Sequence, residues 1–157
     1  MKKIYNAIKN RNLTKDLLNS NNKTPLFSLD GKTKLCKVVD VYDGDSCKVV
    51  FRHSNKLCRW NIRMAGYDSP EMRPSRNKIG REKEIEAAKK ARDYLISLVK
   101  NENQLVYIKC GEFDKYGRLL GKLYINKDDN KSVNDLMIEN KHAYSYDGGT
   151  KKIIKYL

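Results

Sequence analysis

The central segment of the chain, residues 58–71, reads CRWNIRMAGYDSPE. Its first half alternates between apolar and polar side chains, a period of two that predicts a strand with one buried face. Arg63 falls on the polar face of this strand. Pro70 cannot donate a hydrogen bond to a neighbouring strand, so the strand must end before it. We therefore expect Asp68 and Glu71 on a stiff turn close to Arg63, a combination that suggests an anion, a metal and a water.

Working outward, the whole chain has 157 residues, enough for one domain with its own core. It carries 33 Lys and Arg against 19 Asp and Glu, for a net charge of +14. Such an excess favours a polyanionic partner, nucleic acid first and an anionic membrane surface second. A lysine-rich surface that only keeps the protein in solution is the alternative.

The cysteines and the N-terminus concern the cellular compartment. The four cysteines lie in apolar, strand-like runs without metal-site spacing, so we expect buried, reduced thiols. The basic N-terminus is not followed by an apolar run, and no run is long enough to span a membrane. The sequence therefore predicts an intracellular, cytoplasmic protein without a signal peptide or membrane association. It gives no sign of an obligate protein partner.

Two parts of the chain differ in character. Residues 1–31 are expected to form an extension with short helices, and residues 32–157 a compact domain. Phe27 and Leu29 are expected to pack onto that domain. The helices are predicted from the spacing of four apolar residues: Ile4, Ile8, Leu17 and Leu18.

The order of elements in the domain predicts a mainly β fold with helices. Strands are expected over 35–41, 46–51, 57–64, 104–110 and 118–125, and helices over 81–100 and after Ser132. A five-stranded OB-fold β-barrel has this order, with a long helix between strands 3 and 4 and a short helix after strand 5. Other small barrels also have five strands, so the order alone does not select this fold.

A second acidic group precedes the predicted second strand. Asp43 and Asp45 flank Gly44, and an Asp-Gly pair by itself most often only turns a hairpin. Because the third strand runs back beside the second, Asp45 and Asp68 are expected to approach each other and to share one cation. Carboxylates, backbone carbonyls and water are hard donors that suit Ca²⁺ better than Zn²⁺.

Two further groups are ambiguous when considered alone. Arg118 begins the predicted fifth strand, and a lone arginine there is ordinarily a surface residue. Tyr144 and Tyr146 are two residues apart, so that they share one face. Core packing and an exposed platform on which bases stack both fit these tyrosines.

Together, the motifs resemble the staphylococcal nuclease (thermonuclease) family. The similarity covers about residues 34–146 and depends on three motifs in this order: DGDS at 43–46, Arg63 with DSPE at 68–71, and DKYGR at 114–118. The resemblance implies an OB-fold barrel and a Ca²⁺-dependent nuclease. Such an enzyme would hydrolyse the phosphodiester bonds of DNA and RNA and leave 3′-phosphate ends.

The resemblance also implies metal ligands. Asp45 and Asp68 would ligate calcium directly, Ser69 would contribute its backbone carbonyl, and Asp43 would support the metal from behind its ligands.

The remaining implied roles concern the substrate. Glu71 would orient or deprotonate the attacking water, while Arg63 and Arg118 would hold the phosphate. The nucleotide pocket would be lined by Lys115, Tyr116, Tyr144 and Tyr146. We expect single-stranded DNA and RNA to be the preferred partners.

Two other functions fit the sequence less well. One is an OB-fold module that binds nucleic acid without cutting it, and the other is a basic packaging protein. Degenerate domains of this family lose carboxylates or arginines. Here all five of the residues in question are present: Asp45, Arg63, Asp68, Glu71 and Arg118.

Overall fold

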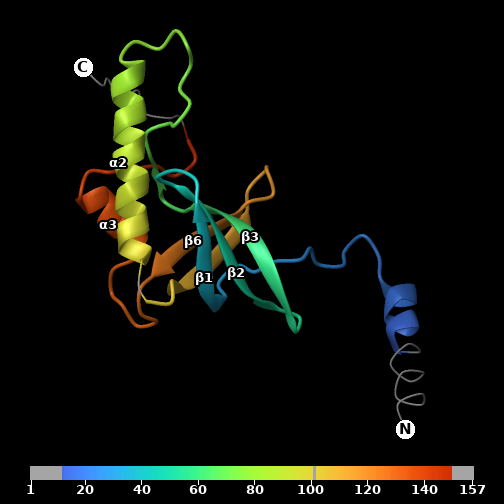
Figure 1. Cartoon of the computed structure of the whole chain (residues 1–157). Coiled ribbons are helices and arrows are strands. Elements are labelled where there is room, and N and C mark those ends of the chain that lie inside the picture. The colour runs from blue at the N-terminus through green and yellow to red at the C-terminus, as the bar shows by residue number, and fades with distance from the viewer. Residues whose placement is uncertain (1–11, 101, 150–157) are drawn as a thin grey trace.

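The structure, a computed structural model, describes residues 12–100 and 102–149. Five strands close into a barrel in the order β1-β2-β3-β6-β5 (Figure 1), which confirms the expected fold. Their bounds are Thr33–Val41 (β1), Ser46–His53 (β2), Lys56–Met64 (β3), Leu105–Phe113 (β5) and Leu119–Tyr124 (β6). The long helix α2, Arg81–Val99, lies between β3 and β5 in the chain, and the short helix α3, Val133–Glu139, follows β6.

The barrel closes through one parallel pair. β1 pairs with β2 and with β5, β2 with β3, and β5 with β6, all antiparallel. β3 and β6 instead run parallel, with Ile62 opposite Leu119 and Met64 opposite Gly121. This closure places the start of β6 beside the end of β3, so Arg118 comes to the same end of the barrel as Arg63.

The sequence did not predict a second, two-stranded sheet beside the barrel. In it β4, Tyr67–Asp68, pairs antiparallel with β7, Tyr144–Ser145. Asp68 lies opposite Tyr144 in this ladder. The segment after α3 is thereby attached directly to residues 66–71, the acidic turn that follows β3.

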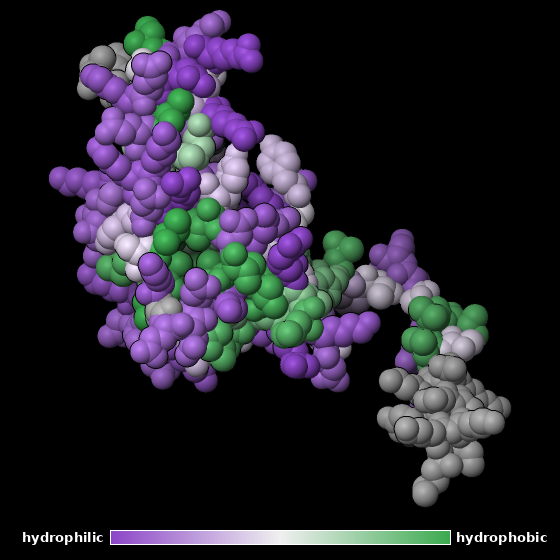
Figure 2. Space-filling view, in the orientation of Figure 1, coloured by the Kyte–Doolittle hydropathy of each residue, from purple (hydrophilic) through white to green (hydrophobic). Residues whose placement is uncertain are grey.

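The core follows the two periods expected from the sequence. Alternate residues of β2 and β3 point into the barrel, among them Val49 and Ile62, which are buried. α2 covers the barrel with residues at helical spacing, buried at Ala88, Ala91, Leu95 and Val99. Figure 2 shows hydrophilic groups over α2 and the loop before it, and apolar groups over the barrel.

The start of α3 was predicted correctly. Ser132 is the N-cap, and its hydroxyl accepts a hydrogen bond from the backbone N–H of Asp135 at 3.1 Å. The Asp135 carboxylate accepts in return from the backbone N–H of Ser132 at 2.9 Å. Two of the N–H groups that a helix start leaves unpaired are satisfied in this way.

The segment before the barrel is partly attached to it. Residues 12–19 are helical, and the predicted elements at residues 1–11 lie outside the described residues. Leu29 is buried, as expected. The ring of Phe27 remains largely exposed but contacts His53 and Phe113, at 5.1 and 6.1 Å between ring centroids.

The cysteines are free thiols, but one departs from the expectation of burial. Cys36, Cys47 and Cys110 are buried, and burial raises the pKa of Cys36 to about 12. Cys58 is only half-buried, because it lies near the hairpin tip between β2 and β3, beyond the cover of the core. Within the described ranges, no helix is both long and apolar enough to cross a membrane.

Candidate functional site

A cleft of about 560 Å³ opens at the end of the barrel where β3 ends. Its walls come from segments that are far apart in the sequence: the turn before β2, the end of β3 with the acidic turn, the β5–β6 loop, and residues 146–148. The cleft brings together most of the residues singled out from the sequence: Asp43, Asp45, Arg63, Asp68, Glu71, Lys115, Tyr116, Arg118 and Tyr146. Ser69 and Tyr144 are not part of its lining.

At the base of the cleft, Arg63 lies between two carboxylates. Its Nη1 is 2.9 Å from Asp45 Oδ2, and its Nη2 donates to Asp68 Oδ1. The three side chains are nearly buried, with 11% of Arg63, 10% of Asp45 and 3% of Asp68 exposed. The expectation that the two aspartates approach each other is confirmed, and one guanidinium joins them.

Asp45 is held by several donors. Its Oδ2 accepts hydrogen bonds from the backbone N–H and the hydroxyl of Ser69, both at 3.0 Å. Its own backbone N–H donates to Asp43 Oδ1 at 3.0 Å, so Asp43 shapes the turn that presents Asp45. Contacts from the β1–β2 turn, from β3 and from the acidic turn thus fix the positions of Asp45 and Asp68.

Burial makes the charge of Asp45 costly. Burial raises the pKa of Asp45 to about 6, although the positive charge of Arg63 acts to lower it. The neighbouring carboxylates Asp43 and Asp68 raise it further. A cation close to these oxygens would favour the charged form.

The donors available fit a hard divalent ion. Asp45 and Asp68 offer carboxylate oxygens, and the Ser69 carbonyl is close in sequence to Asp68. Oxygen donors of this kind suit Ca²⁺. Within residues 12–100 and 102–149, no three His, Cys, Asp or Glu residues gather as a metal-binding group. A metal here would therefore depend on two carboxylates, assisted by a carbonyl and by water.

Tyr144 contacts Asp68 from outside the cleft. Its hydroxyl donates to Asp68 Oδ2 at 2.6 Å. It lines a different cavity, together with Pro70 and His142, whereas Tyr146 lines the cleft. The two tyrosines, expected to share one face, thus border different spaces.

Asp114 orients the second arginine. Asp114 Oδ2 accepts from Arg118 Nε at 2.7 Å, and Oδ1 accepts from the backbone N–H groups of Tyr116 and Arg118, both at 2.9 Å. Burial raises the pKa of Asp114, but these hydrogen bonds outweigh it and hold the pKa below its ordinary value. The carboxylate therefore keeps its charge and fixes the guanidinium at the mouth of the cleft.

An aromatic ring stands beside these groups. Tyr116 is 71% exposed. The Lys115 ammonium lies 5.1 Å and the Arg118 guanidinium 5.5 Å from the centre of its ring. One accessible ring face and two cations thus lie together at the edge of the cleft.

Glu84, which sequence reasoning missed, supports the segment that carries Glu71. It is 3% exposed, in the first turn of α2. Its Oε1 accepts from the backbone N–H of Glu71 at 3.4 Å, and its Oε2 lies 2.7 Å from Lys78 Nζ. Glutamate is common in the first turn of a helix for reasons of the helix dipole alone, so the sequence carries no signal for this role.

Two other buried polar groups were missed. The Tyr67 hydroxyl donates to the Gly44 carbonyl at 2.7 Å. The Asn134 amide accepts from the Leu123 N–H at 3.0 Å and donates to the carbonyls of Ala65, at 2.9 Å, and Gly121, at 3.1 Å. Asn134 stands between the apolar Val133 and the charged Asp135, so its local sequence does not mark it as buried.

Gly44 is required by close packing. A Cβ at this position would lie 2.8 Å from the Cβ atoms of both Ala91 and Ser69. The glycine that the sequence suggested as a turn residue therefore also lets the β1–β2 turn approach α2 and the acidic turn.

The pH dependence of stability should reveal the buried Asp45. Its folded pKa of about 6 lies above its ordinary value of 3.8, so the folded state binds more protons between these values. The contribution of Asp45 to folding stability is therefore lost as the pH rises through this window. When the pH is raised from 4 to 7, the free energy of unfolding of Asp45→Asn should therefore increase by about 1–3 kcal/mol relative to that of wild type. Both are measured by denaturant unfolding with a chelator. Asp40→Asn, which removes an exposed carboxylate, should show no such gain; equal behaviour of the two variants would contradict the assignment.

The role of Glu84 can be tested in the loop it holds. Glu84→Gln keeps an oxygen for the Glu71 N–H but removes the charge that faces Lys78, so residues 72–80 should open more often. Limited trypsin digestion followed by mass spectrometry should show several-fold faster cleavage within this loop. Glu86→Gln is the matched control, because Glu86 is an exposed residue of the same helix paired with Lys90. Unchanged cleavage in Glu84→Gln would mean that the loop is held by other contacts.

The chain matches a family of known proteins. The family model of staphylococcal nuclease homologues matches residues 61–156, a range that contains Arg63, Asp68, Glu71 and Arg118. No curated protein matches the chain significantly. The family is generally one of nucleases, and these typically use Ca²⁺. Because the match covers more than half of the chain and the barrel is of the OB type, the protein belongs to the staphylococcal nuclease homologue family.

Proposed function

We propose that the protein is a calcium-dependent nuclease that hydrolyses phosphodiester bonds of DNA and RNA and leaves 3′-phosphate ends. The observation that carries this proposal is the recessed arrangement of Arg63, Asp45 and Asp68, with Glu71 and Arg118 on the same cleft. Family membership supports a nuclease or a nucleic-acid-binding role. The net charge of +14 suits a polyanionic substrate.

Calcium would be held by Asp45 and Asp68, with the Ser69 carbonyl as a further donor and Asp43 fixing the turn behind them. When bound, it would supply positive charge that offsets the charge of the phosphodiester. Tyr144 would keep Asp68 in place through its hydroxyl, whose hydrogen bond is 2.6 Å long.

The arginines would bind the phosphate. A guanidinium donates two parallel hydrogen bonds to two oxygens, and its grip strengthens as negative charge accumulates in the transition state. Arg118 is already oriented for this by Asp114. Arg63 would contact the phosphate from the base of the cleft.

Glu71 would act on the water that attacks phosphorus, either by orienting it or by taking its proton. Lys115, Tyr116 and Tyr146 would bind the nucleotide next to the scissile bond. The exposed ring of Tyr116 offers a face on which a base can stack.

Incubation with labelled single-stranded DNA tests the proposal. Cleavage should occur with Ca²⁺, leave 3′-phosphates detectable by mass spectrometry, and stop in excess chelator; Mg²⁺, which is smaller and holds its waters, should support little turnover. Asp68→Asn should abolish cleavage. Ca²⁺ should also raise the melting temperature of wild type but not of Asp68→Asn, a readout independent of activity.

The results separate the alternatives. Full activity in excess chelator would refute the calcium requirement. Binding of DNA without cleavage under every condition would identify a non-catalytic OB-fold module instead.

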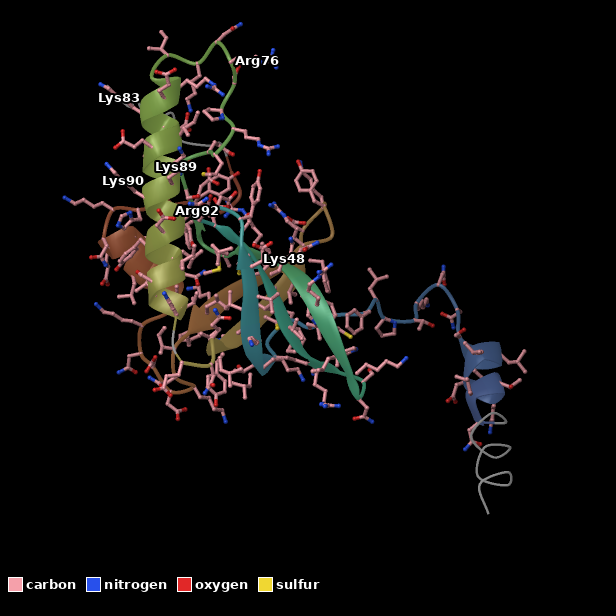
Figure 3. The ribbon with its side chains drawn as sticks, viewed as in Figure 1. Lys48, Arg76, Lys83, Lys89, Lys90 and Arg92 are labelled. Atoms are coloured by element: carbon pink, nitrogen blue, oxygen red, sulfur yellow. The ribbon has the colours of Figure 1, made fainter. Side chains whose placement is uncertain are left out.

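Exchange of each arginine for lysine tests the phosphate grip. Arg63→Lys and Arg118→Lys preserve the net charge but lose the planar fork, so kcat should fall by roughly 10²–10³ with a smaller change in KM. Arg92→Lys is the control, because Arg92 lies on α2 (Figure 3) and pairs only with the adjacent Asp93 among described residues. Both constants should be measured on one oligonucleotide at fixed salt and calcium. If all three variants cleave alike, neither Arg63 nor Arg118 grips the phosphate.

A further inference from the structure

We propose that the cavity beside Tyr144 binds a small organic anion with an apolar body, and that this ligand raises the affinity of the neighbouring acidic site for calcium. The cavity has a volume of about 350 Å³ and is distinct from the cleft. Binding of the ligand does not depend on the proposed function, whereas its effect on calcium rests on it.

The acidic turn separates the cleft from the cavity. Asp68 and Glu71 line the cleft, whereas Pro70 between them lines the cavity. The other walls of the cavity come from α2 and from the segment that leads from the end of α3 into β7: Ala87, Lys90, Ile138, Lys141, His142, Ala143 and Tyr144. Among the described residues, none lines both spaces. A molecule in the cavity would therefore leave the cleft open to its substrate.

The walls of the cavity suit an apolar group. Pro70, Ala87, Ile138 and Ala143 contribute aliphatic surface. The imidazole of His142 stacks on Tyr94, with 4.3 Å between the ring centroids and 24° between the planes, so this wall is fixed without a ligand. The volume lies at the lower end of the range found for small-molecule sites. A single flat or aliphatic group can therefore be buried here.

The polar part of the lining is cationic. Lys90, Lys141 and His142 belong to it, and no Asp or Glu of the described ranges does. Lys90 pairs with Glu86 at 2.8 Å, but both side chains are 67% exposed. Because exposed pairs contribute little free energy, Lys90 can exchange this carboxylate for the anionic group of a ligand. The charge of the lining thus selects an anion.

The backbone at the end of α3 fixes this part of the cavity. Lys141 has a φ of +60°, in the left-handed region where helices usually end on glycine. Its N–H donates to the Ile138 carbonyl at 3.0 Å, and the N–H groups of His142 and Ala143 donate to the Met137 carbonyl at 3.0 and 3.1 Å. The segment that supplies two of the cations is therefore ordered before any ligand binds.

Tyr144 connects the cavity to the acidic site. It lines the cavity, and its hydroxyl donates to Asp68 Oδ2 at 2.6 Å. The two residues also lie opposite each other in the ladder of β4 and β7. A ligand packed against Tyr144 and Pro70 would restrict the movement of Asp68, and a carboxylate already held in place costs less free energy to order around a metal. Ligand and Ca²⁺ should therefore each raise the affinity of the other by the same factor.

A pair of aromatic probes tests the cavity. 2-Naphthoate has an apolar ring system and one negative charge, and 2-naphthamide is its neutral counterpart. In fluorescence titrations of the full chain in chelator, 2-naphthoate should have a roughly tenfold lower Kd than 2-naphthamide. In two-dimensional NMR spectra, 2-naphthoate should shift the backbone amide signals of Lys141, Tyr144 and Asp68. The signals of Lys115 and Tyr116, at the edge of the cleft, should stay in place.

Removal of two cations tests the selection of an anion. Lys90→Gln/Lys141→Gln should raise the Kd of 2-naphthoate roughly tenfold and leave that of 2-naphthamide unchanged. Both lysines are exposed, so the variant should fold like wild type. The control is Lys89→Gln/Lys127→Gln, which removes two exposed lysines outside the cavity. Lys89 is the neighbour of Lys90 on α2 (Figure 3), and this control should bind both probes as wild type does.

Calcium tests the connection to the acidic site. In wild type, saturating Ca²⁺ should lower the Kd of 2-naphthoate about fivefold. Tyr144→Phe keeps the ring that lines the cavity but loses the hydroxyl that reaches Asp68. This variant should still bind 2-naphthoate, and the effect of Ca²⁺ on the Kd should disappear.

The cavity is refuted as an anion site if the two probes bind equally, if the lysine variant binds like its control, or if the NMR shifts are confined to the edge of the cleft. The connection is refuted if the Asp68 signal does not move in chelator, if bound Ca²⁺ leaves the Kd unchanged, or if its effect persists in Tyr144→Phe. If wild type neither binds Ca²⁺ nor cleaves nucleic acid, the proposed function fails, while the titrations and spectra in chelator still decide on the cavity and on its connection to Asp68.

Discussion

Three nearly buried charges at one end of the barrel depend on one another. Arg63 bridges Asp45 and Asp68 and offsets one of their two negative charges, and without it two carboxylates would lie side by side with little water. Asp45 comes from the turn before β2, Arg63 from the end of β3, and Asp68 from β4. Their meeting requires the β2–β3 register, in which Ser46 lies opposite Arg63, and the tight turn that brings Asp68 back over the strand.

That turn depends in its own right on a distant part of the chain. The two-residue ladder between β4 and β7 holds it, and the Tyr144 hydroxyl donates to Asp68 Oδ2, the carboxylate oxygen that does not accept from Arg63 Nη2. Asn134 of α3 binds the carbonyl of Ala65 immediately before the turn. The segment after β6 is therefore a structural support of the acidic site, although most of its residues lie outside the cleft.

Sequence patterns predicted what local chemistry determines. The alternation over residues 58–64, the helical spacing on α2 and the N-cap Ser132 each appear in the structure because burial and capping act over a few residues. The pairing of β4 with β7 could not be predicted, since a strand of two residues has no period. Glu84 and Tyr144 bind partners that are 13 and 76 positions away, so nothing in their local sequence predicts these two contacts.

The approach of the β1–β2 turn to α2 has a consequence for the helix itself. Only a hydrogen atom fits between Gly44 and the side chains of Ala91 and Ser69. α2 contributes no side chain to the cleft lining, yet the β1–β2 turn packs directly against its surface. The position of the helix therefore limits how close Asp45 lies to the acidic turn. A bulkier residue at Ala91, in the middle of an otherwise ordinary helix, would spread the two aspartates without touching either.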